Sequence, residues 1–303
     1  MRVGLGLPCV GSWATPDNIA SVARDADAAG FAGLWTFQRW LATDEMDAVY
    51  HSVIDPMIAL AFAAAVTERV RLGVAIVNGP FYSPVAVAKQ FAALDVVSKG
   101  RFDGGVGLGW MPQEYAAAGQ TTERRGARLD EWLRCLFVLL SDERVEFDGE
   151  FYTVPPMIIA PRSVQRPRPP VLVGGTADVA LRRAGGLADG WVSSSRLSLD
   201  DVVRSVRMVR SAAVDAGKAP EDVRCVVRGV TRLRDSVDAS ARRPLEGSLD
   251  QVHDDLARYA AAGVDEVFLD LNFDSQLVGS PTADPAVGLE FVQRLLPLGR
   301  ETF

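Results

Sequence analysis

Strand-like and helix-like patterns alternate along the whole chain, and this alternation restricts the folds open to it. Across the 303 residues, a short apolar run is followed by a helical pattern eight times. The predicted strands are residues 2–7, 32–37, 72–77, 101–108, 171–175, 190–194, 223–230 and 266–271. Regular alternation implies a parallel sheet, and eight repeats predict an α/β fold, a closed (β/α)8 TIM barrel. The alternative is a doubly wound open sheet, which normally uses fewer strands.

Helix boundaries are marked by capping residues. Thr15 followed by Pro16 predicts a helix start, and Gly30 its end. We expect one domain over residues 1–303, with insertions in the loops that follow strands. The largest is an irregular excursion at about 143–168, which holds a predicted hairpin at 145–154.

Composition argues against several classes of partner. The net charge is −7, with acids and bases scattered, so a nucleic-acid partner is not expected. No apolar run reaches the roughly 18 residues of a membrane span, and the first ten residues do not resemble a signal peptide; we expect a cytoplasmic protein. Cys9, Cys135 and Cys225 are too few and too widely spaced for a disulfide framework or a zinc site, and the last two are predicted core residues.

In a parallel barrel the active site lies at the carboxyl ends of the strands. The residues predicted there are polar and aromatic, but they include no Cys/His or Ser/His/Asp pattern and no metal-ligand cluster. Of the two histidines, His51 follows the second strand, on the active-site side, where an imidazole can act as an acid or base. His253 falls within a late helix and is predicted to be a surface residue.

Two strand ends are rich in glycine. "GGVGLGW" (104–110) lacks the helix that a dinucleotide fingerprint requires, so its glycines indicate tight packing or a flat ligand ring. In "VLVGGTADVALRRAG" a strand runs into Gly174 and Gly175, and Thr176 is the predicted N-cap of a helix. Exposed backbone N–H groups there suit a phosphate, although Asp178 already complements the helix dipole. Together these ends suit a phosphorylated planar cofactor that brings its own redox chemistry.

Three long stretches carry a family resemblance. They are "RLGVAIVNGPFYSPVAVAKQFAALDVVSKGRFDGGVGLGWMPQEYAAAG", "ERRGARLDEWLRCL" and "FYTVPPMIIAPRSVQRPRPPVLVGGTADVALRRAGGLADGWV". They resemble the bacterial luciferase-like monooxygenase superfamily, and most closely its branch of coenzyme F420-dependent oxidoreductases from actinobacteria. The resemblance covers most of the chain and is specific for the family, not for the substrate.

The resemblance implies a set of cofactor contacts. Members of the deazaflavin-using branch carry a bulge at the end of strand three, with a non-prolyl cis peptide behind the central ring; here this is the Ala75–Ile76 bond. The residues implied to flank the ring, line its rim or hold the phosphate are Gln38, Ala75, Ile76, Asn78, Gly107, Leu108, Gly109, Trp110, Val173, Gly174, Gly175 and Thr176. We also expect a large side chain at Gly175 to weaken cofactor binding without unfolding the barrel.

The sequence departs from the sugar-phosphate dehydrogenases of the superfamily. Their His and Glu are replaced by Gln38-Arg39 and Trp110, so that activity is not expected. Arg39, His51 and Glu114 remain as catalytic candidates for substrate contact or proton transfer. The alternative is structural: Glu114 on an exposed helix face, and Arg39 paired with Asp44 or Glu45.

The leading functional hypothesis is an oxidoreductase that transfers a hydride between coenzyme F420 and a small organic substrate. One alternative is an FMN-dependent two-component monooxygenase, and another is an F420-binding protein without turnover. A homodimer is also expected, from the family resemblance and the apolar helix face in "IALAFAAAVT" (58–67).

Overall fold

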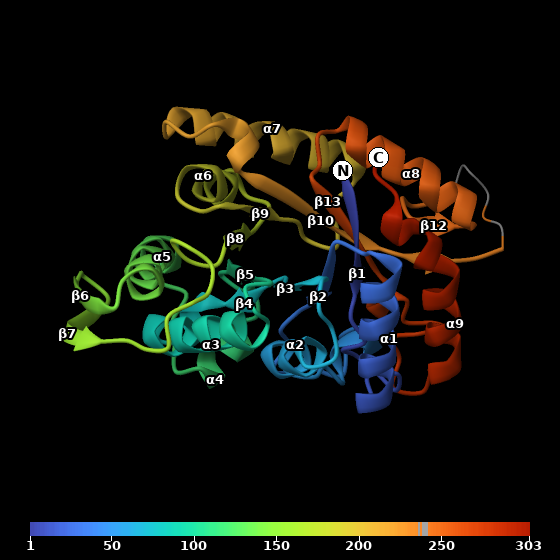
Figure 1. Cartoon of the computed structure of the whole chain (residues 1–303), viewed down its shortest axis with the longest axis horizontal. Coiled ribbons are helices and arrows are strands. Elements are labelled where there is room, and N and C mark those ends of the chain that lie inside the picture. The colour runs from blue at the N-terminus through green and yellow to red at the C-terminus, as the bar shows by residue number, and fades with distance from the viewer. Residues whose placement is uncertain (236, 238–241) are drawn as a thin grey trace.

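The computed structural model describes residues 1–235, 237 and 242–303, and within them parallel strands close into a barrel (Figure 1). The barrel strands are β1 (Arg2–Gly6), β2 (Gly33–Thr36), β3 (Arg71–Val74), β4 (Val77–Asn78), β5 (Phe102–Gly107), β8 (Val171–Gly174), β9 (Gly190–Val192), β10 (Arg224–Val230) and β13 (Glu266–Asp270). Their order is β3-β2-β1-β13-β10-β9-β8-β5-β4, and a β3–β5 pairing closes the ring. Because β3 and β4 are two halves of one interrupted strand, the barrel has eight strand positions, and the predicted fold is confirmed.

Helices follow the strands and cover the outside of the barrel (Figure 1). They are α1 (Pro16–Ala29), α2 (Pro56–Ala64), α3 (Pro84–Val97), α4 (Pro112–Ala117), α5 (Arg125–Ser141), α6 (Asp178–Gly186), α7 (Leu199–Asp215), α8 (Leu249–Ala261) and α9 (Pro285–Leu295). The 3-10 turns are η1 (Ala48–Tyr50), η2 (Gly79–Phe81), η3 (Pro220–Asp222), η4 (Leu271–Phe273) and η5 (Leu296–Arg300). The predicted hairpin forms from β6 (Arg144–Asp148) and β7 (Thr153–Ile158), which project from one side, and β11 (Arg232–Leu233) pairs with β12 (Glu246–Gly247).

Local chemistry explains where the helices begin. The Thr15 hydroxyl accepts a hydrogen bond from the Asn18 N–H at 3.2 Å, and Gly30 ends α1 with a φ of +87°. Ser198 and Ser248 each complete a capping box. One prediction is wrong: α6 begins at Asp178 with Ala177 as its cap residue, so Thr176 does not cap it.

Two apolar layers build the core. Outward-facing strand residues pack against the helices, whereas inward-facing residues fill the barrel. The inner cluster comprises Trp35, Ala75, Leu172, Val192, Val226 and Phe268, with Ile76 packed against it. The predicted core residues Cys135 and Cys225 are buried, as is Cys9, and burial raises the pKa of the Cys135 thiol to about 11.

A cluster of charged residues lies at the amino-terminal end of the barrel, where the strands begin. The Asp103 carboxylate accepts from Arg71 at 2.6 Å and from Arg224 at 3.0 Å. Arg224 also donates to Glu266 at 3.0 Å, and the Trp35 indole N–H donates to the same carboxylate at 2.7 Å. These contacts tie β2, β3, β5, β10 and β13 together below the apolar interior.

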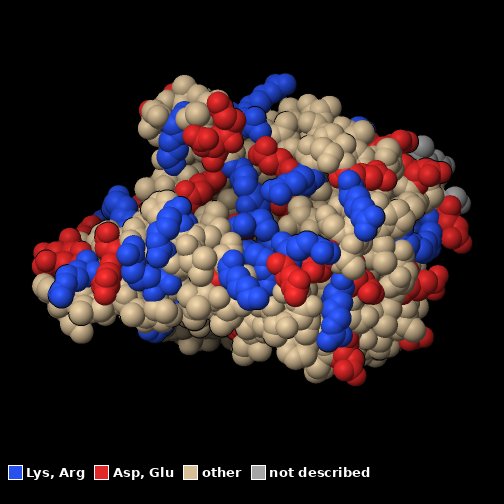
Figure 2. Space-filling model, viewed as in Figure 1, with Lys and Arg blue, Asp and Glu red and all other residues tan. Residues whose placement is uncertain are grey.

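The surface carries both signs of charge. Figure 2 shows Lys and Arg side chains gathered around a hollow near the middle of one face, with Asp and Glu beside them. No helix in the described residues is long and apolar enough to cross a membrane.

Candidate active site

The third strand is interrupted between β3 and β4. The Ala75–Ile76 peptide bond there is cis, as predicted. The Ile76 side chain turns onto the neighbouring strands, where glycines make room for it: a Cβ on Gly107 would lie 2.8 Å from Ile76 Cδ1, and one on Gly174 would lie 3.0 Å from its Cγ2. Ile76 therefore forms an apolar platform at the carboxyl ends of β5 and β8, with the glycines beneath it.

Asn78 lies beside this platform with its amide group available. The residue is only 5% exposed, yet its side chain makes no hydrogen bond with any described residue. Its backbone N–H donates to Gln38 Oε1 at 2.8 Å, and the Gln38 amide donates to the Tyr82 hydroxyl. Gln38 thus fixes the backbone of Asn78, while the Asn78 amide can bind a polar ligand edge.

The end of β5 turns sharply beside Asn78. Gly109 has a φ of +74°, and a Cβ there would come within 3.0 Å of the Asn78 amide. Leu108 accepts a hydrogen bond from the Tyr115 hydroxyl through its carbonyl, and Trp110 beyond it is 56% exposed. This turn brings backbone and an exposed indole close to the platform.

Arg39 and Glu114 form a buried ion pair at the same end of the barrel. Arg39 Nη1 lies 2.8 Å from Glu114 Oε2, and the two side chains are 8% and 1% exposed. Glu114 Oε1 also accepts the backbone N–H groups of Trp40 at 2.8 Å and Leu41 at 3.2 Å. Both structural alternatives are therefore wrong in detail: Glu114 is not on an exposed face, and Arg39 pairs with Glu114 instead of Asp44 or Glu45.

This ion pair holds the segment after β2 in place. The Arg39 guanidinium stacks over the Tyr50 ring at 5.0 Å and over the Trp110 ring at 4.9 Å. Because both Glu114 oxygens accept hydrogen bonds, the carboxylate is arranged to hold this segment. The arrangement favours a positioning role for Glu114.

The end of β8 is exposed backbone. Gly174 and Gly175 are half-buried, Thr176 is exposed, and the N–H groups of Thr176 and Ala177 donate to no described residue. Gly175 has a φ of +148°, and a Cβ on it would lie 2.5 Å from Ala180 Cβ. A large side chain here would therefore destabilise α6 as well, which corrects the expectation of an unchanged fold.

Two predicted site residues lie apart from this group. His51 is exposed and its Nε2 lies 3.2 Å from the Thr43 carbonyl oxygen. The Val173 side chain packs in the outer core layer, so only the backbone of this residue is open to contact by a ligand at the end of β8. His253 is on the surface as predicted, with Nε2 3.1 Å from Glu301. Among the described residues there is no group of three or more side chains arranged to hold a metal.

Comparison with known proteins places this geometry in a family. The family model described as luciferase-like monooxygenase matches residues 4–269. The chain belongs to the luciferase-like monooxygenase family. The resemblance found in the sequence is thus confirmed at family level.

Two of the proteins that this chain resembles are named for different cofactors. An uncharacterised protein of Mycobacterium tuberculosis is 33% identical over 213 residues, covering 69% of this chain and 75% of its own. The FMNH2-dependent dimethylsulfone monooxygenase of Pseudomonas putida is 30% identical over 211 residues, covering 69% and 56%. The structure of coenzyme F420-dependent tetrahydromethanopterin reductase from Methanopyrus kandleri superposes with a TM-score of 0.78 at 17% identity, covering 100% of this chain and 99% of its own.

Sequence reasoning missed several residues at the mouth of this luciferase-like barrel. Tyr82 joins Gln38 to Trp40, whose indole N–H donates to its hydroxyl at 3.2 Å. Arg196 and Arg232 line a cavity beside Arg228. A polar residue at the end of a strand is a usable signal, and Arg228 near the end of β10 fits it. Arg196 and Arg232 follow their strands, so where their side chains point depends on the path of the chain after β9 and β10.

Proposed function

We propose that the protein is an oxidoreductase that transfers a hydride between coenzyme F420 and a small organic substrate. The observation that carries the proposal is the interrupted third strand, which sets Ile76 as an apolar platform beside the Asn78 amide, a group without a hydrogen-bond partner among the described residues. A planar tricyclic ring needs such a flat apolar support and a polar contact at its edge.

The residues present fit a phosphorylated planar cofactor. Ile76 offers an apolar face, and the Asn78 amide offers a donor and an acceptor. The N–H groups of Thr176 and Ala177, which donate to no described residue, suit a phosphate. When bound, a deazaflavin supplies the hydride chemistry. The chain's own part is to orient the substrate and exclude water, for which Trp40 and Trp110 stand at the mouth.

The second candidate is an FMN-dependent monooxygenase. The Pseudomonas putida relative favours it, because that protein is named for its dependence on reduced FMN. The same platform would support the flavin ring. The fold of the Methanopyrus kandleri reductase, which is named for F420, supports the first candidate.

The test is a fluorescence titration of the purified protein with F420 and with FMN. We expect F420 to bind and FMN to bind at least tenfold more weakly. Asn78→Ala should weaken F420 binding with an unchanged melting temperature, because the Asn78 side-chain amide makes no hydrogen bond with any described residue. Gln38→Ala is the contrasting variant and should lower the melting temperature, because it removes two hydrogen bonds.

Three outcomes would contradict the proposal. Binding of FMN alone would favour the monooxygenase, and tight F420 binding without turnover of any tested acceptor would favour a cofactor-binding protein. Equal F420 affinity in wild type and Asn78→Ala would remove Asn78 from the site.

We further propose a homodimer through α2 and α3. Ile58 and Phe62 on α2 are 69% and 43% exposed, and Val97 on the adjacent α3 is 57% exposed. Exposed apolar side chains on adjacent helices are typical of interaction surfaces. Light scattering at micromolar concentration should show a dimer, and Ile58→Asp with Phe62→Asp should give a monomer.

The matched control for the dimer is Val179→Asp, since Val179 is 66% exposed on α6, elsewhere on the barrel. This variant should remain dimeric. A monomeric wild-type protein would remove the proposal.

A further inference from the structure

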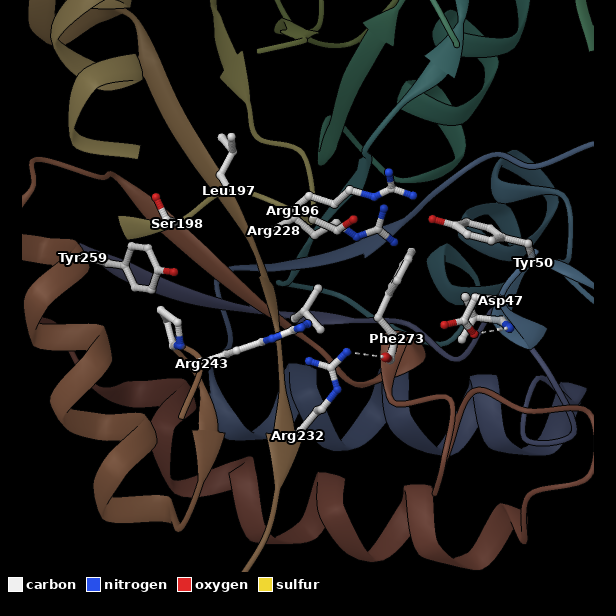
Figure 3. A pocket seen from close by; sticks show the side chains of 14 residues that line it. Asp47, Tyr50, Arg196, Leu197, Ser198, Arg228, Arg232, Arg243, Tyr259 and Phe273 are labelled. Atoms are coloured by element: carbon white, nitrogen blue, oxygen red, sulfur yellow. Dashed lines mark hydrogen bonds between the residues drawn. The ribbon is translucent and has the colours of Figure 1, made fainter. Parts of the chain in front are cut away.

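A cavity of about 500 Å3 opens at the carboxyl ends of β9, β10 and β13 (Figure 3). The charged residues that line it are Asp47 and four arginines, namely Arg196, Arg228, Arg232 and Arg243. We call this cavity the arginine pocket. Figure 3 shows Arg196 and Arg228 side by side, with Arg232 and Arg243 on another wall. The volume lies within the range of small-ligand sites, about 300–1,000 Å3.

Most of this positive charge has no carboxylate partner among the described residues. Arg228 alone is ion-paired, through Nε to Asp270 Oδ2 at 2.6 Å, and its terminal nitrogens donate to no described residue. Arg232 donates to the Phe273 carbonyl at 3.2 Å, while Arg196 and Arg243 pair with no carboxylate of the described chain. Among the described lining residues Asp47 is the one acid, and its carboxylate already accepts the Val49 N–H.

Arg228 is rigidly held. Its guanidinium lies 4.2 Å from the ring centroids of both Phe37 and Phe273, and its side chain is 9% exposed. A planar guanidinium fixed in this way binds an oxyanion through two parallel hydrogen bonds. Tyr259 adds a neutral donor from the far wall, because burial raises the pKa of its hydroxyl to about 12.

Strand β10 connects the pocket to the Ile76 platform. Alternate strand residues point to the same side, so Val226, Arg228 and Val230 all face inward. Val226 belongs to the inner cluster against which Ile76 packs, and Arg228 and Val230 line the pocket. Val226 and Arg228 are two residues apart, which is about 6.6 Å along a strand. A small molecule bound in the pocket can therefore extend along β10 to the inner cluster against which Ile76 packs.

We propose that the arginine pocket binds the carboxylate or phosphate group of a small organic anion, which is the substrate. This inference rests on the proposed function, since it places the anion's reacting carbon above Ile76. The arginines would hold the charged end, and the uncharged remainder would extend along β10 toward the platform.

The test is calorimetric titration of the protein without cofactor, at low salt. The probes are benzoate, phenyl phosphate and benzamide, which is the uncharged counterpart of benzoate. We expect at least one anion to bind tenfold or more tightly than benzamide, and the double variant Arg196→Gln/Arg232→Gln to lose that preference. Arg207→Gln, on the exposed face of α7, is the matched control and should keep it. Arg228 is left intact because its loss would strand the buried Asp270 carboxylate.

The two anions distinguish a carboxylate site from a phosphate site. Equal affinity for benzoate, phenyl phosphate and benzamide in the wild type would overturn the proposal. A second result would also overturn it: the double variant binds F420 with its glutamate tail more weakly than the wild type does, but binds the tail-free deazaflavin equally well. The pocket would then hold the tail of the cofactor and not the substrate. Anion binding that depends on these arginines in a protein that binds neither F420 nor FMN would uphold the pocket and refute the proposed function.

Discussion

At the scale of single residues, the Glu114 carboxylate accepts three hydrogen bonds at the barrel mouth. The donors are Arg39 and the N–H groups of Trp40 and Leu41, and the Glu114 side chain is 1% exposed. This carboxylate stabilises the folded protein because three donors share one buried negative charge. Its removal would leave all three donors without an acceptor.

We therefore predict that Glu114→Ala lowers the free energy of unfolding by about 3 kcal/mol. Urea denaturation would measure it, with the exposed Glu123→Ala as a control that should change little. If Glu114→Ala were as stable as the wild type, the geometric role assigned to this residue would be wrong.

At the scale of elements, β3, β4 and β5 are fitted to one another through glycine. A Cβ on Gly105 would lie 1.9 Å from the Val74 carbonyl oxygen, which is backbone and cannot move aside. On Gly107 its close contacts would be with the Ile76 side chain, at 2.8 Å from Cδ1 and 3.1 Å from Cγ1, while the nearest backbone atom, the Gly174 carbonyl oxygen, is 3.8 Å away. The two glycines thus have different roles. Gly105 allows β5 to approach the backbone of β3, and Gly107 leaves room for the Ile76 side chain.

The expected consequence is a large difference between two alanine variants. Gly105→Ala should lower the free energy of unfolding by about 3 kcal/mol or more, whereas Gly107→Ala should cost about 1 kcal/mol and shift cofactor affinity by moving Ile76. Thermal melts with F420 titrations would compare them. Similar stability for the two proteins would show that strand contact at Gly105 is more adaptable than the structure implies.

At the scale of the whole molecule, the apolar interior lies between the mouth and the charged cluster where the strands begin. Although burial alone would raise it, the pKa of Asp103 is held below its ordinary value by Arg224 and Arg71. Burial instead raises the pKa of Glu266. The charged form of Asp103 is therefore favoured by folding, and that of Glu266 is disfavoured.

These directions give opposite pH dependences. The stability due to Asp103 is present above the ordinary carboxyl pKa of 3.8 and is lost as the pH falls through the lower folded value. We predict that Asp103→Asn lowers the free energy of unfolding at pH 7 by about 3 kcal/mol and reduces its dependence on pH below 3.8. The contribution of Glu266 is greatest below its ordinary pKa and is lost as the pH rises through the raised value, so Glu266→Gln should cost less at pH 7 than at acid pH.

Denaturation curves collected across the acid range would measure both variants. The exposed Asp178→Asn is the control for a charge pair open to solvent and should follow the wild type. An unaltered acid limb in Asp103→Asn would contradict the assignment.

The sequence by itself determined the barrel, most helix starts and the strand ends that carry the site, because periodicity and capping are local properties. The family resemblance located the cis bond at Ala75–Ile76. Tertiary structure alone decided that Arg39 meets Glu114, 75 residues away, and that Arg196, the Arg228 and Arg232 pair and Arg243 share one pocket although they lie far apart in the sequence. The physical reason is that local patterns fix each strand and its helix, whereas the pairing of buried charges depends on how the closed ring brings distant strand ends together.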